Sequence, residues 1–378
     1  MSQGIFWLSV TLLGYTYVGY ALLIRVLARR NANNAETAFT PPVTIVIAAY
    51  NEASRIATRV RNVLEQDYPA ENLSVIVMSD GSTDGTERAA AIDDARARVI
   101  ALAHNAGKAV AINAALEQVQ TPFVVFTDAR QRFAPDALRR LLANFSDARI
   151  GAVSGELEIV ENFAEPNLPQ TAAPIGLYWR MEKSLRDGEA RIGWLHGVSG
   201  AIYALRRELF VPLPPGTILD DMWVPLHVVF AGRRIAMARD AIASDSASAS
   251  SHEEFRRKVR TLAGNWQLIA RMPRLLVPWR NPVWFAWVSH KFLRLIAPWA
   301  LIAAWFGAAL TPGAFYRFAW LLQTLAYVAA LFALFAPRHA AKIPLLTAAG
   351  SFLMLNAAAC LALPASLALD PRGLWKKH

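Results

Sequence analysis

The chain has 378 residues, of which 54% are hydrophobic and only 18% charged, below the quarter or so that soluble domains carry. This composition excludes an ordinary soluble enzyme, because the apolar excess is concentrated in long segments without charge, and it indicates an integral membrane protein with one domain of catalytic size. The net charge of +10 would suit nucleic acid, but the basic residues crowd beside the apolar segments. We therefore expect membrane lipids as the partner, and no nucleic acid.

The first apolar segment covers residues 4–24, about the ~20 residues that cross a bilayer core. Basic residues follow this segment, at Arg25, Arg29 and Arg30, and none precedes it, which is the reverse of a secretory signal. The positive-inside rule then predicts a transmembrane helix within residues 1–30 whose N-terminal end faces outward. The expected location is the inner (plasma) membrane, with several spans and the following domain in the cytoplasm.

Residues 41–250 alternate short apolar runs with helical patterns, which is typical of a parallel sheet. Strands are expected over residues 43–49, 73–78, 99–102 and 122–127, with helices to about residue 66 and residue 119 after the first and third. Three of these strands run into acidic residues, at Glu52, Asp80 and Asp128. Open α/β sheets bind ligands beyond the carboxyl ends of their strands, although turn chemistry alone also places Asp there.

The rest of this domain is less regular. Residues 150–159 are expected to be extended, residues 196–207 to run from a glycine turn into a helix, and Asp220-Asp221 to start another helix. Gly107-Lys108 is not part of a P-loop, because Leu102 stands where the first glycine of that motif belongs. Cys360 is the single cysteine, so one chain can build neither a disulfide nor a cysteine metal site.

Residues 251–290 are expected to form basic interfacial helices, because Arg and Lys mixed with Trp are typical of the headgroup layer. Residues 291–369 are expected to form the C-terminal transmembrane helices. Three spans after the domain would put the C-terminus outside, whereas its basic residues, Arg372, Lys376 and Lys377, prefer the cytoplasm. Two alternatives stay open: the last apolar run, with its prolines, is re-entrant, or residues 282–288 are more than interfacial.

A set of short motifs then suggests a family. In chain order they are Ala49-Tyr50-Asn51-Glu52, Ser79-Asp80-Gly81-Ser82-Thr83-Asp84, Asn105-Ala106-Gly107-Lys108, Thr127-Asp128-Ala129-Arg130, Ser199-Gly200, Asp220-Asp221 and Arg257-x-x-Arg260. No single motif is specific, but their order resembles that of the membrane-bound family 2 glycosyltransferases, the cellulose, hyaluronan and poly-N-acetylglucosamine synthase group. The resemblance covers about residues 42–271.

The resemblance implies an α/β domain of the GT-A fold, with a mostly parallel nucleotide-sugar-binding sheet flanked by transmembrane helices. It implies inverting transfer of a sugar from a nucleotide-sugar, with a UDP-sugar as the first expectation. The implied acceptor is a lipid-linked saccharide or a polysaccharide of the cell surface. Two functions from other classes compete with this one, a non-catalytic scaffold of a polysaccharide export complex and a transporter, and a processive polysaccharide synthase is a further alternative.

The family's donor-site roles transfer position by position. By this resemblance Tyr50, Glu52 and Asp80 hold the base and ribose, and Lys108 lies near the nucleotide. Asp128 matches the first Asp of the Asp-x-Asp motif, which binds the diphosphate through a divalent metal, Mg²⁺ or Mn²⁺. The alternatives are that Asp80 and its neighbour Asp84 are turn residues only, and that Lys108 is a surface lysine at a helix start.

The remaining roles concern transfer. Asp220 and Asp221 match the catalytic acidic pair, and by this resemblance Asp221 is the general base, although acidic residues at a helix start also serve as caps. Ser199 and Gly200 would border the acceptor. The last motif would supply guanidinium groups over the leaving pyrophosphate, from Arg257 and Arg260. The alternative is that the helix carrying these arginines lies on lipid headgroups.

Two positions depart from the family pattern. Arg130 replaces the second Asp of Asp-x-Asp, so either Asp128 holds the metal with water and phosphate oxygens, or Arg130 supplies part of the positive charge. Thr261 replaces the Trp that stacks on the acceptor sugar in processive enzymes. We therefore expect transfer of one or a few sugars rather than synthesis of a long homopolymer.

Overall fold

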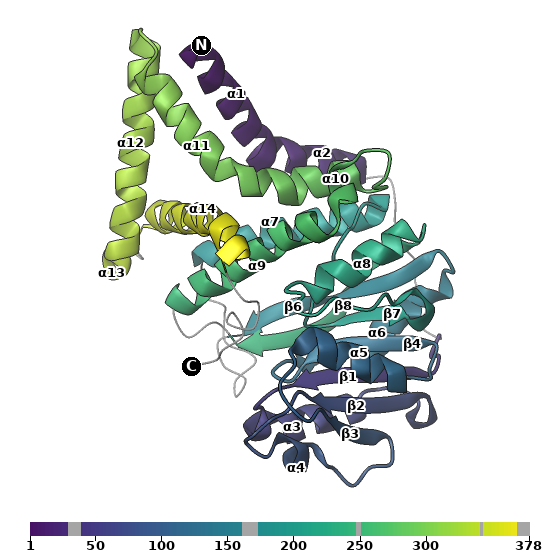
Figure 1. Cartoon of the computed structure of the whole chain (residues 1–378). Coiled ribbons are helices and arrows are strands. Elements are labelled where there is room, and N and C mark those ends of the chain that lie inside the picture. Colours follow the sequence, from purple (N-terminus) through teal and green to yellow (C-terminus); the bar gives the residue numbers. More distant parts are fainter. Residues whose placement is uncertain (29–38, 161–172, 247–250, 341–342, 369–378) are drawn as a thin grey trace. The chain divides into compact units, whose positions relative to one another are not determined.

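The computed structural model describes residues 1–28, 39–160, 173–246, 251–340 and 343–368 (Figure 1). The chain divides into two compact units, which we treat separately. The helical unit comprises Met1–Arg29, Pro169–Gly188 and Ser248–Leu369, and the sheet unit comprises Arg30–Leu168, Glu189–Ala247 and Asp370–His378.

The sheet unit is built on one eight-stranded sheet with the order β3-β2-β1-β4-β7-β6-β8-β5. Its strands are β1 (Val43–Ala49), β2 (Leu73–Ser79), β3 (Ala97–Ala101), β4 (Phe123–Asp128), β5 (Arg132–Phe133), β6 (Ile150–Val160), β7 (Tyr203–Arg206) and β8 (Arg234–Ser246). Strands β1 to β4 are mutually parallel where they pair, β7 is antiparallel to both β4 and β6, and β6 and β8 are parallel. This mixed α/β sheet confirms the expected fold class.

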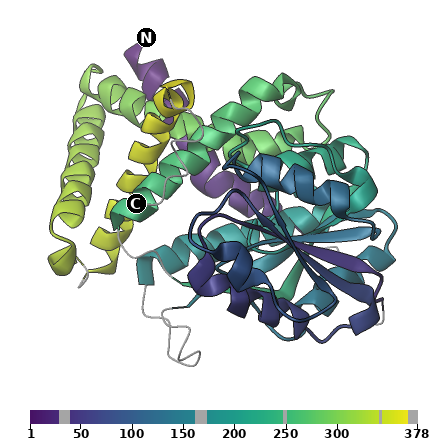
Figure 2. The ribbon, with the colours of Figure 1, turned by 60° about the horizontal axis from the view of Figure 1, so that its bottom comes forward.

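Helices cover both faces of the sheet (Figure 2). They are α3 (Ala53–Leu64), α4 (Thr86–Ala90), α5 (Lys108–Gln118), α6 (Ala137–Ala143) and α8 (Asp220–Phe230). Alternate residues of the buried strand β1 point to opposite faces. Ile45 and Ile47 join the core under α3 and α6, whereas Val46 and Ala48 line a small cavity with Ile112 of α5.

The prediction of a helix within residues 196–207 was wrong. Tyr203–Arg206 form β7, which fills the position between β4 and β6. Ala204 pairs with Val125 on one side and with Val153 on the other. Two strands with open edges therefore determine the conformation of a four-residue segment that has no strong local preference.

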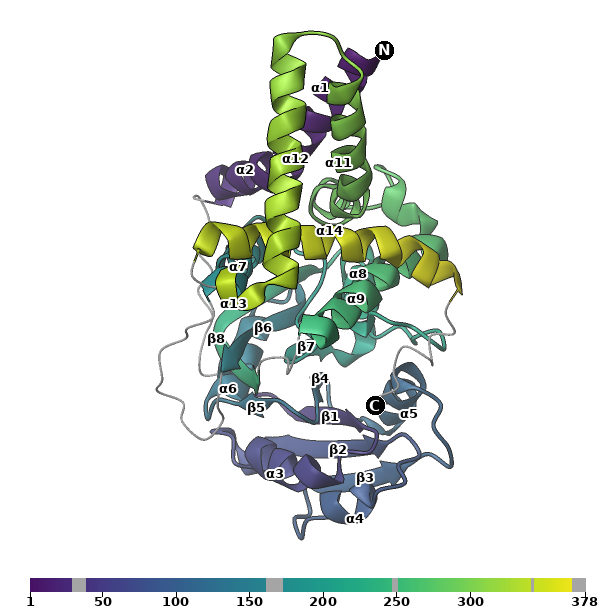
Figure 3. The same cartoon turned by 90° about the vertical axis from the view of Figure 1, so that its left-hand side faces the viewer.

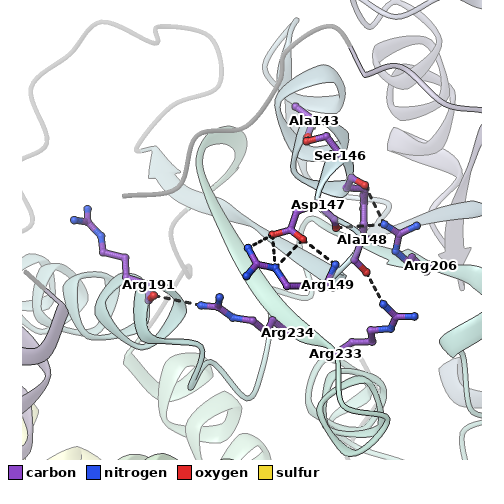
Figure 4. A network of polar contacts seen from close by, with 10 residues as sticks. Ala143, Ser146, Asp147, Ala148, Arg149, Arg191, Arg206, Arg233 and Arg234 are labelled. Atoms are coloured by element: carbon purple, nitrogen blue, oxygen red, sulfur yellow. Dashed lines mark hydrogen bonds and ion pairs between the residues drawn. The ribbon is translucent and has the colours of Figure 1, made fainter. Parts of the chain in front are cut away.

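An arginine cluster, Arg149, Arg206, Arg233 and Arg234, holds the segment that leads into β6 (Figure 4). Arg206 donates from Nε to the Ile150 carbonyl at 2.8 Å and from Nη2 to the Phe145 carbonyl at 2.9 Å. Arg233 donates to the Ala148 carbonyl at 2.6 Å, and Arg149 pairs with Asp147. Because most of these donors go to backbone carbonyls, the cluster fixes the main chain of this segment.

The helical unit contains four helices that are long and apolar enough to cross a membrane, judged by length and composition: Ser2–Leu27, Trp284–Ala309, Ala314–Phe335 and Pro344–Leu367. The first is continuous through α1 (Ser2–Gly14), η1 (Tyr15–Gly19) and α2 (Tyr20–Leu27). The second joins α10 (Trp284–Trp287), η7 (Val288–Phe292) and α11 (Leu293–Ala309), so residues 284–288 belong to a long apolar helix. The others are α12 (Ala314–Phe335) and α14 (Pro344–Ala368).

The other long helices of this unit are α9 (Ser251–Arg271) and most of α7 (Ala173–Ile192). Glu182 of α7 accepts hydrogen bonds from His290 Nε2 at 2.8 Å and Arg294 Nη1 at 2.7 Å, and Lys291 lies 3.3 Å away. Burial alone would raise the pKa of Glu182, but these basic neighbours together hold it well below its usual value. The basic residues of the second apolar helix are thus paired within the helical unit.

Candidate active site

The acidic residues predicted at the strand ends lie at one edge of the sheet. β1 and β4 pair in register, with Ala48 opposite Asp128, and Ala49 of β1 lies opposite Ser79 of β2. Asp80 and Asp128 therefore follow neighbouring parallel strands at the same edge, and the segment containing Glu52 leaves β1 there too. This is the edge at which open α/β sheets bind ligands.

Lys108 is the centre of an acidic cluster that we define as Asp128, Asp220 and Asp221 together with this lysine. Its Nζ lies 3.0 Å from Asp128 Oδ1 and 3.2 Å from Asp220 Oδ2, and its side chain is 15% exposed. Burial by itself would lower the pKa of Lys108, but the three carboxylates together raise it above its usual value. Lys108 is thus an ion-paired residue of the site and not a solvated surface lysine.

Asp220 and Asp221 open helix α8, where the positive end of the helix dipole stabilises carboxylates. The N-cap is Leu219, so neither Asp occupies the capping position. Asp221 lies against Gly200, since a Cβ added to that glycine would be 3.4 Å from Asp221 Oδ2. Gly200 therefore leaves room at the carboxylate that the sequence assigns as the base.

The chain after β2 is shaped by Asp80. Asp80 Oδ1 accepts the Ala106 N–H at 2.7 Å, and Oδ2 accepts the Gly107 N–H at 2.8 Å and Asn105 Nδ2 at 3.0 Å. Gly81 has φ +64° and its position admits no side chain, because an added Cβ would lie 2.3 Å from the His104 carbonyl carbon. Asp80 thus holds in place the loop that leads to Lys108, and its contact with a nucleotide stays a prediction.

The loop after β1 is tied to the same region by Asp84, whose carboxylate accepts the N–H groups of Ala53 and Thr86, each at 3.0 Å. Burial raises the pKa of Asp84, but these hydrogen bonds and one from the Thr86 hydroxyl together lower it below its usual value. The Glu52 N–H donates to Thr86 Oγ1 at 2.8 Å, and the Glu52 carboxylate pairs with Arg55 at 3.0 Å. Tyr50 is 42% exposed, as a residue that contacts a base would be before binding.

The residues at the metal motif fit an ion that takes most of its ligands from a bound diphosphate. Arg130 does not point back to Asp128 but pairs with Asp245, Nε to Oδ2 at 3.1 Å. Asp128 keeps 34% of its side chain exposed, and buried Asp220 Oδ2 has an ion pair but no hydrogen bond among the described residues. Mg²⁺ sites of this kind use one or two carboxylates with phosphate oxygens and water.

Tyr203 is a site residue that the sequence did not reveal. Its ring stacks on Phe126 with centroids 4.8 Å apart, and its buried hydroxyl has no hydrogen-bond partner in the part of the chain that the structure describes. Burial first, and then Asp220, Asp221 and Asp128, raise the pKa of Tyr203 well above its usual value. The sequence pattern predicts a helix for the segment that contains Tyr203. In the structure this segment is strand β7, and Tyr203 lies near the acidic cluster.

Arg257 and Arg260 lie on α9, in the helical unit, where Arg257 pairs with Glu254. Thr261 donates to the Arg257 carbonyl at 3.0 Å, so its hydroxyl is used within its own helix. The expected contact of these arginines with a leaving pyrophosphate stays a prediction.

The sheet, with acidic residues at the carboxyl ends of parallel strands, is a GT-A-like domain. In agreement, residues 44–211 match the family model described as Glycosyl transferase family 2. The mannosyltransferase PcManGT from Pyrobaculum calidifontis, solved in complex with GDP-Man and Mn²⁺, has a similar fold, with a TM-score of 0.72 at 23% identity over 97% of this chain and 99% of that one.

Two relatives are named for the transfer or the polymerisation of N-acetylglucosamine. An N-acetylglucosaminyltransferase of Rhizobium leguminosarum bv. viciae is 27% identical over 56% of this chain and 53% of its own. The poly-β-1,6-N-acetyl-D-glucosamine synthase of Staphylococcus aureus (strain COL) is 27% identical over 51% and 47%, respectively. The chain therefore spans about half the length of these relatives.

Proposed function

We propose that this protein is a membrane glycosyltransferase that transfers a sugar, with inversion, from a nucleotide-sugar to a lipid-linked or polysaccharide acceptor in cell-surface polysaccharide synthesis. The observation that carries the proposal is the acidic cluster at the carboxyl edge of a family 2 domain. A UDP-sugar is the first donor to test. The catalytic domain faces the cytoplasm, in accord with the arginines that follow the first apolar segment.

In the proposed reaction Asp221 accepts the proton of the acceptor hydroxyl as its oxygen attacks the anomeric carbon. The bond between that carbon and the diphosphate breaks, and the nucleoside diphosphate leaves with the electron pair. Ser199 and Gly200 border the acceptor beside Asp221. Lys108, already held by two carboxylates, lies where a positive charge attracts the diphosphate.

A divalent ion held by Asp128 and the phosphates would neutralise the charge that builds up on the leaving diphosphate. We expect chelation to weaken the binding of nucleoside diphosphate to purified protein at least about tenfold, and Asp128→Asn to have the same effect. Binding that a chelator leaves unchanged would reject the metal and favour Lys108 and Arg130 as its replacement.

The decisive experiment is a donor screen on detergent-purified protein, in which release of nucleoside diphosphate is measured with a panel of nucleotide-sugars. One donor should give turnover that depends on an acceptor. No release with any donor and acceptor, from protein that still binds nucleotide, would support the scaffold alternative.

We expect the product to be short because Thr261 stands where processive enzymes have a stacking Trp. An aromatic side chain that stacks on a nucleic-acid base contributes about 1–3 kcal/mol to binding. Threonine has no aromatic face on which a sugar could stack. We expect one or a few added sugars when the product is sized by mass spectrometry. A ladder of high polymer from the single protein would contradict this and bring Trp266, further along α9, forward as the stacking platform.

A further inference from the structure

Helix α14 is long enough to span a bilayer, but it does not run alongside the other apolar helices. Figure 3 shows α14 crosswise to α12, at the end of α12 that leads to α13 (Pro337–Ala340), and Figure 1 shows the same helix foreshortened at that level. α14 packs along α9 and also contacts α12 and α11. All of these elements belong to the helical unit.

The direction of the bilayer normal comes from α1, α11 and α12. α1 and α11 are antiparallel, because Gly307 lies against Phe6 whereas Tyr15 Oη is 2.8 Å from Ser289 Oγ. α12 starts at the same end, where Trp7 Nε1 donates to Tyr316 Oη at 3.2 Å. These three helices thus form one bundle, with Phe6 and the turn between α11 and α12 at one end and α13 at the other.

The face that α14 exposes is set by its contact with α12. A Cβ added to Gly350 would lie 3.0 Å from Ala333 Cβ, so this side of α14 faces α12. Ala357, Leu361 and Pro364 follow Gly350 at i+7, i+11 and i+14 and so share its face, and all three are exposed. The alanines at 358, 359 and 362, which point the other way, are buried.

We infer that α14 does not cross the bilayer but lies in the plane of the leaflet at the α13 end of the bundle, with the Ala357–Leu361–Pro364 strip against the acyl chains. The strip faces the direction from which α12 comes, which is the hydrocarbon layer. α9, which packs along α14, carries basic residues suited to the phosphates of the same leaflet. The bilayer is then crossed three times, which also places Arg372, Lys376 and Lys377 on the side that basic residues prefer.

The depth of spin labels in the bilayer distinguishes an in-plane α14 from an α14 that spans the bilayer. In a Cys360→Ala background, which removes the only cysteine, single nitroxide labels are placed at Ile343→Cys, just before α14, or at Leu361→Cys, two exposed positions that lie about five turns apart and so share the face of the strip. A spanning helix would separate these labels by about 27 Å in depth, at ~1.5 Å per residue. An in-plane helix keeps them within about 5 Å, both reached by oxygen rather than by a water-soluble nickel chelate.

The control pair is on α12, at the exposed positions Leu322→Cys and Phe332→Cys, which should differ by about 15 Å in depth. A depth difference between the two α14 labels close to the value for a spanning helix would overturn the inference. Labels on α14 that the nickel chelate reaches would also overturn it. Variants that keep nucleotide binding are scored, so misfolded protein does not enter the comparison.

Sidedness gives a second readout. In the same background, a membrane-impermeant maleimide should label His378→Cys in the vesicle orientation that labels the exposed Asp93→Cys of the sheet unit. It should not do so in the orientation that labels Ala314→Cys, at the first residue of α12. Labelling of His378→Cys together with Ala314→Cys means a fourth crossing and rejects the in-plane helix.

Discussion

Strands β4 and β7 connect two charged regions, since Arg206 lies opposite Phe123 at the start of β4 and Asp128 ends that strand. At the first end the arginine cluster donates to backbone carbonyls and to Asp147 (Figure 4). At the other end three carboxylates surround one ammonium, and the hydroxyl of Tyr203 has no partner among the described residues.

The difference suggests separate roles: the arginine cluster stabilises the domain, and the acidic cluster is where we propose that the donor binds. Charges matched within the chain add stability but leave nothing for a ligand. A buried polar group that lacks a partner, beside an excess of carboxylates, is costly in the free protein and indicates a functional site. Mutations at the acidic cluster should therefore affect turnover or donor binding, whereas mutations at the arginine cluster should affect stability alone.

The largest effect is expected for Asp221→Asn. The amide keeps the shape of the side chain but cannot accept the acceptor's proton, so turnover should fall about a hundred- to ten-thousand-fold while nucleotide-sugar binding and the melting midpoint are retained. The matched control is Asp240→Asn, an exposed carboxylate paired with Arg140, which should keep full turnover. Near-normal transfer by the Asp221 variant would remove the assignment of the base.

Lys108→Met should lower stability as well as donor binding. Breaking a buried ion pair costs about 3–5 kcal/mol, and we expect about 1–3 here because Asp128 is partly exposed. In the normal protein the pKa of Lys108 is raised, so its contribution is complete below pH ~10.5 and is lost only as pH rises through the raised value.

Without the ammonium, Asp128 and Asp220 repel each other, and protonation relieves that repulsion. The Lys108→Met variant should therefore melt closer to the unmodified protein at pH 5.5 than at pH 7.5 in thermal unfolding scans. Lys108→Arg keeps the positive charge, so its melting midpoint at pH 7.5 should fall less than that of Lys108→Met. A methionine variant with equal stability at both pH values would show that the ion pairs contribute little.

Arg206→Lys tests the opposite end. Lysine cannot reproduce the forked donation to the Ile150 and Phe145 carbonyls, so we expect a loss of about 1–2 kcal/mol, seen as a lower melting midpoint. Turnover per folded molecule should stay unchanged, because the residue lies at the far end of β4 from Asp128. A drop in turnover at constant stability would show that the two ends are coupled.

The smallest effect is expected for Arg149→Ala in the same arginine cluster. The side chain is 74% exposed, and its 2.8 Å ion pair with Asp147 is open to solvent. Hydrogen bonds from Arg149 lower the pKa of Asp147, so any stabilisation exists above the usual pKa of Asp and disappears as pH falls through the lowered value. The melting midpoint at neutral pH should not change measurably, and a clear decrease would show that this pair is more than a surface contact.

Much of the fold was predictable because its signals are local. The runs that became β1, β2 and β4 are largely apolar, and Asp80 and Asp128 stand at or directly after strand ends. Strand β7 was not predictable, because Tyr203–Arg206 are extended only through pairing with β4 and β6. The position of Tyr203 beside the acidic cluster followed from the same pairing and was missed with it.

The sequence by itself determined the membrane character of the chain, the order of the strands and helices along the first half of the domain, and the carboxylates at the strand ends, since each depends on neighbours in the chain. Only the tertiary structure decided that Lys108 lies between Asp128 and Asp220, that Arg130 pairs with Asp245, and that α14 lies crosswise to α12. These depend on which remote elements pack together, because a charged side chain pairs with whatever partner the fold brings within a few ångströms.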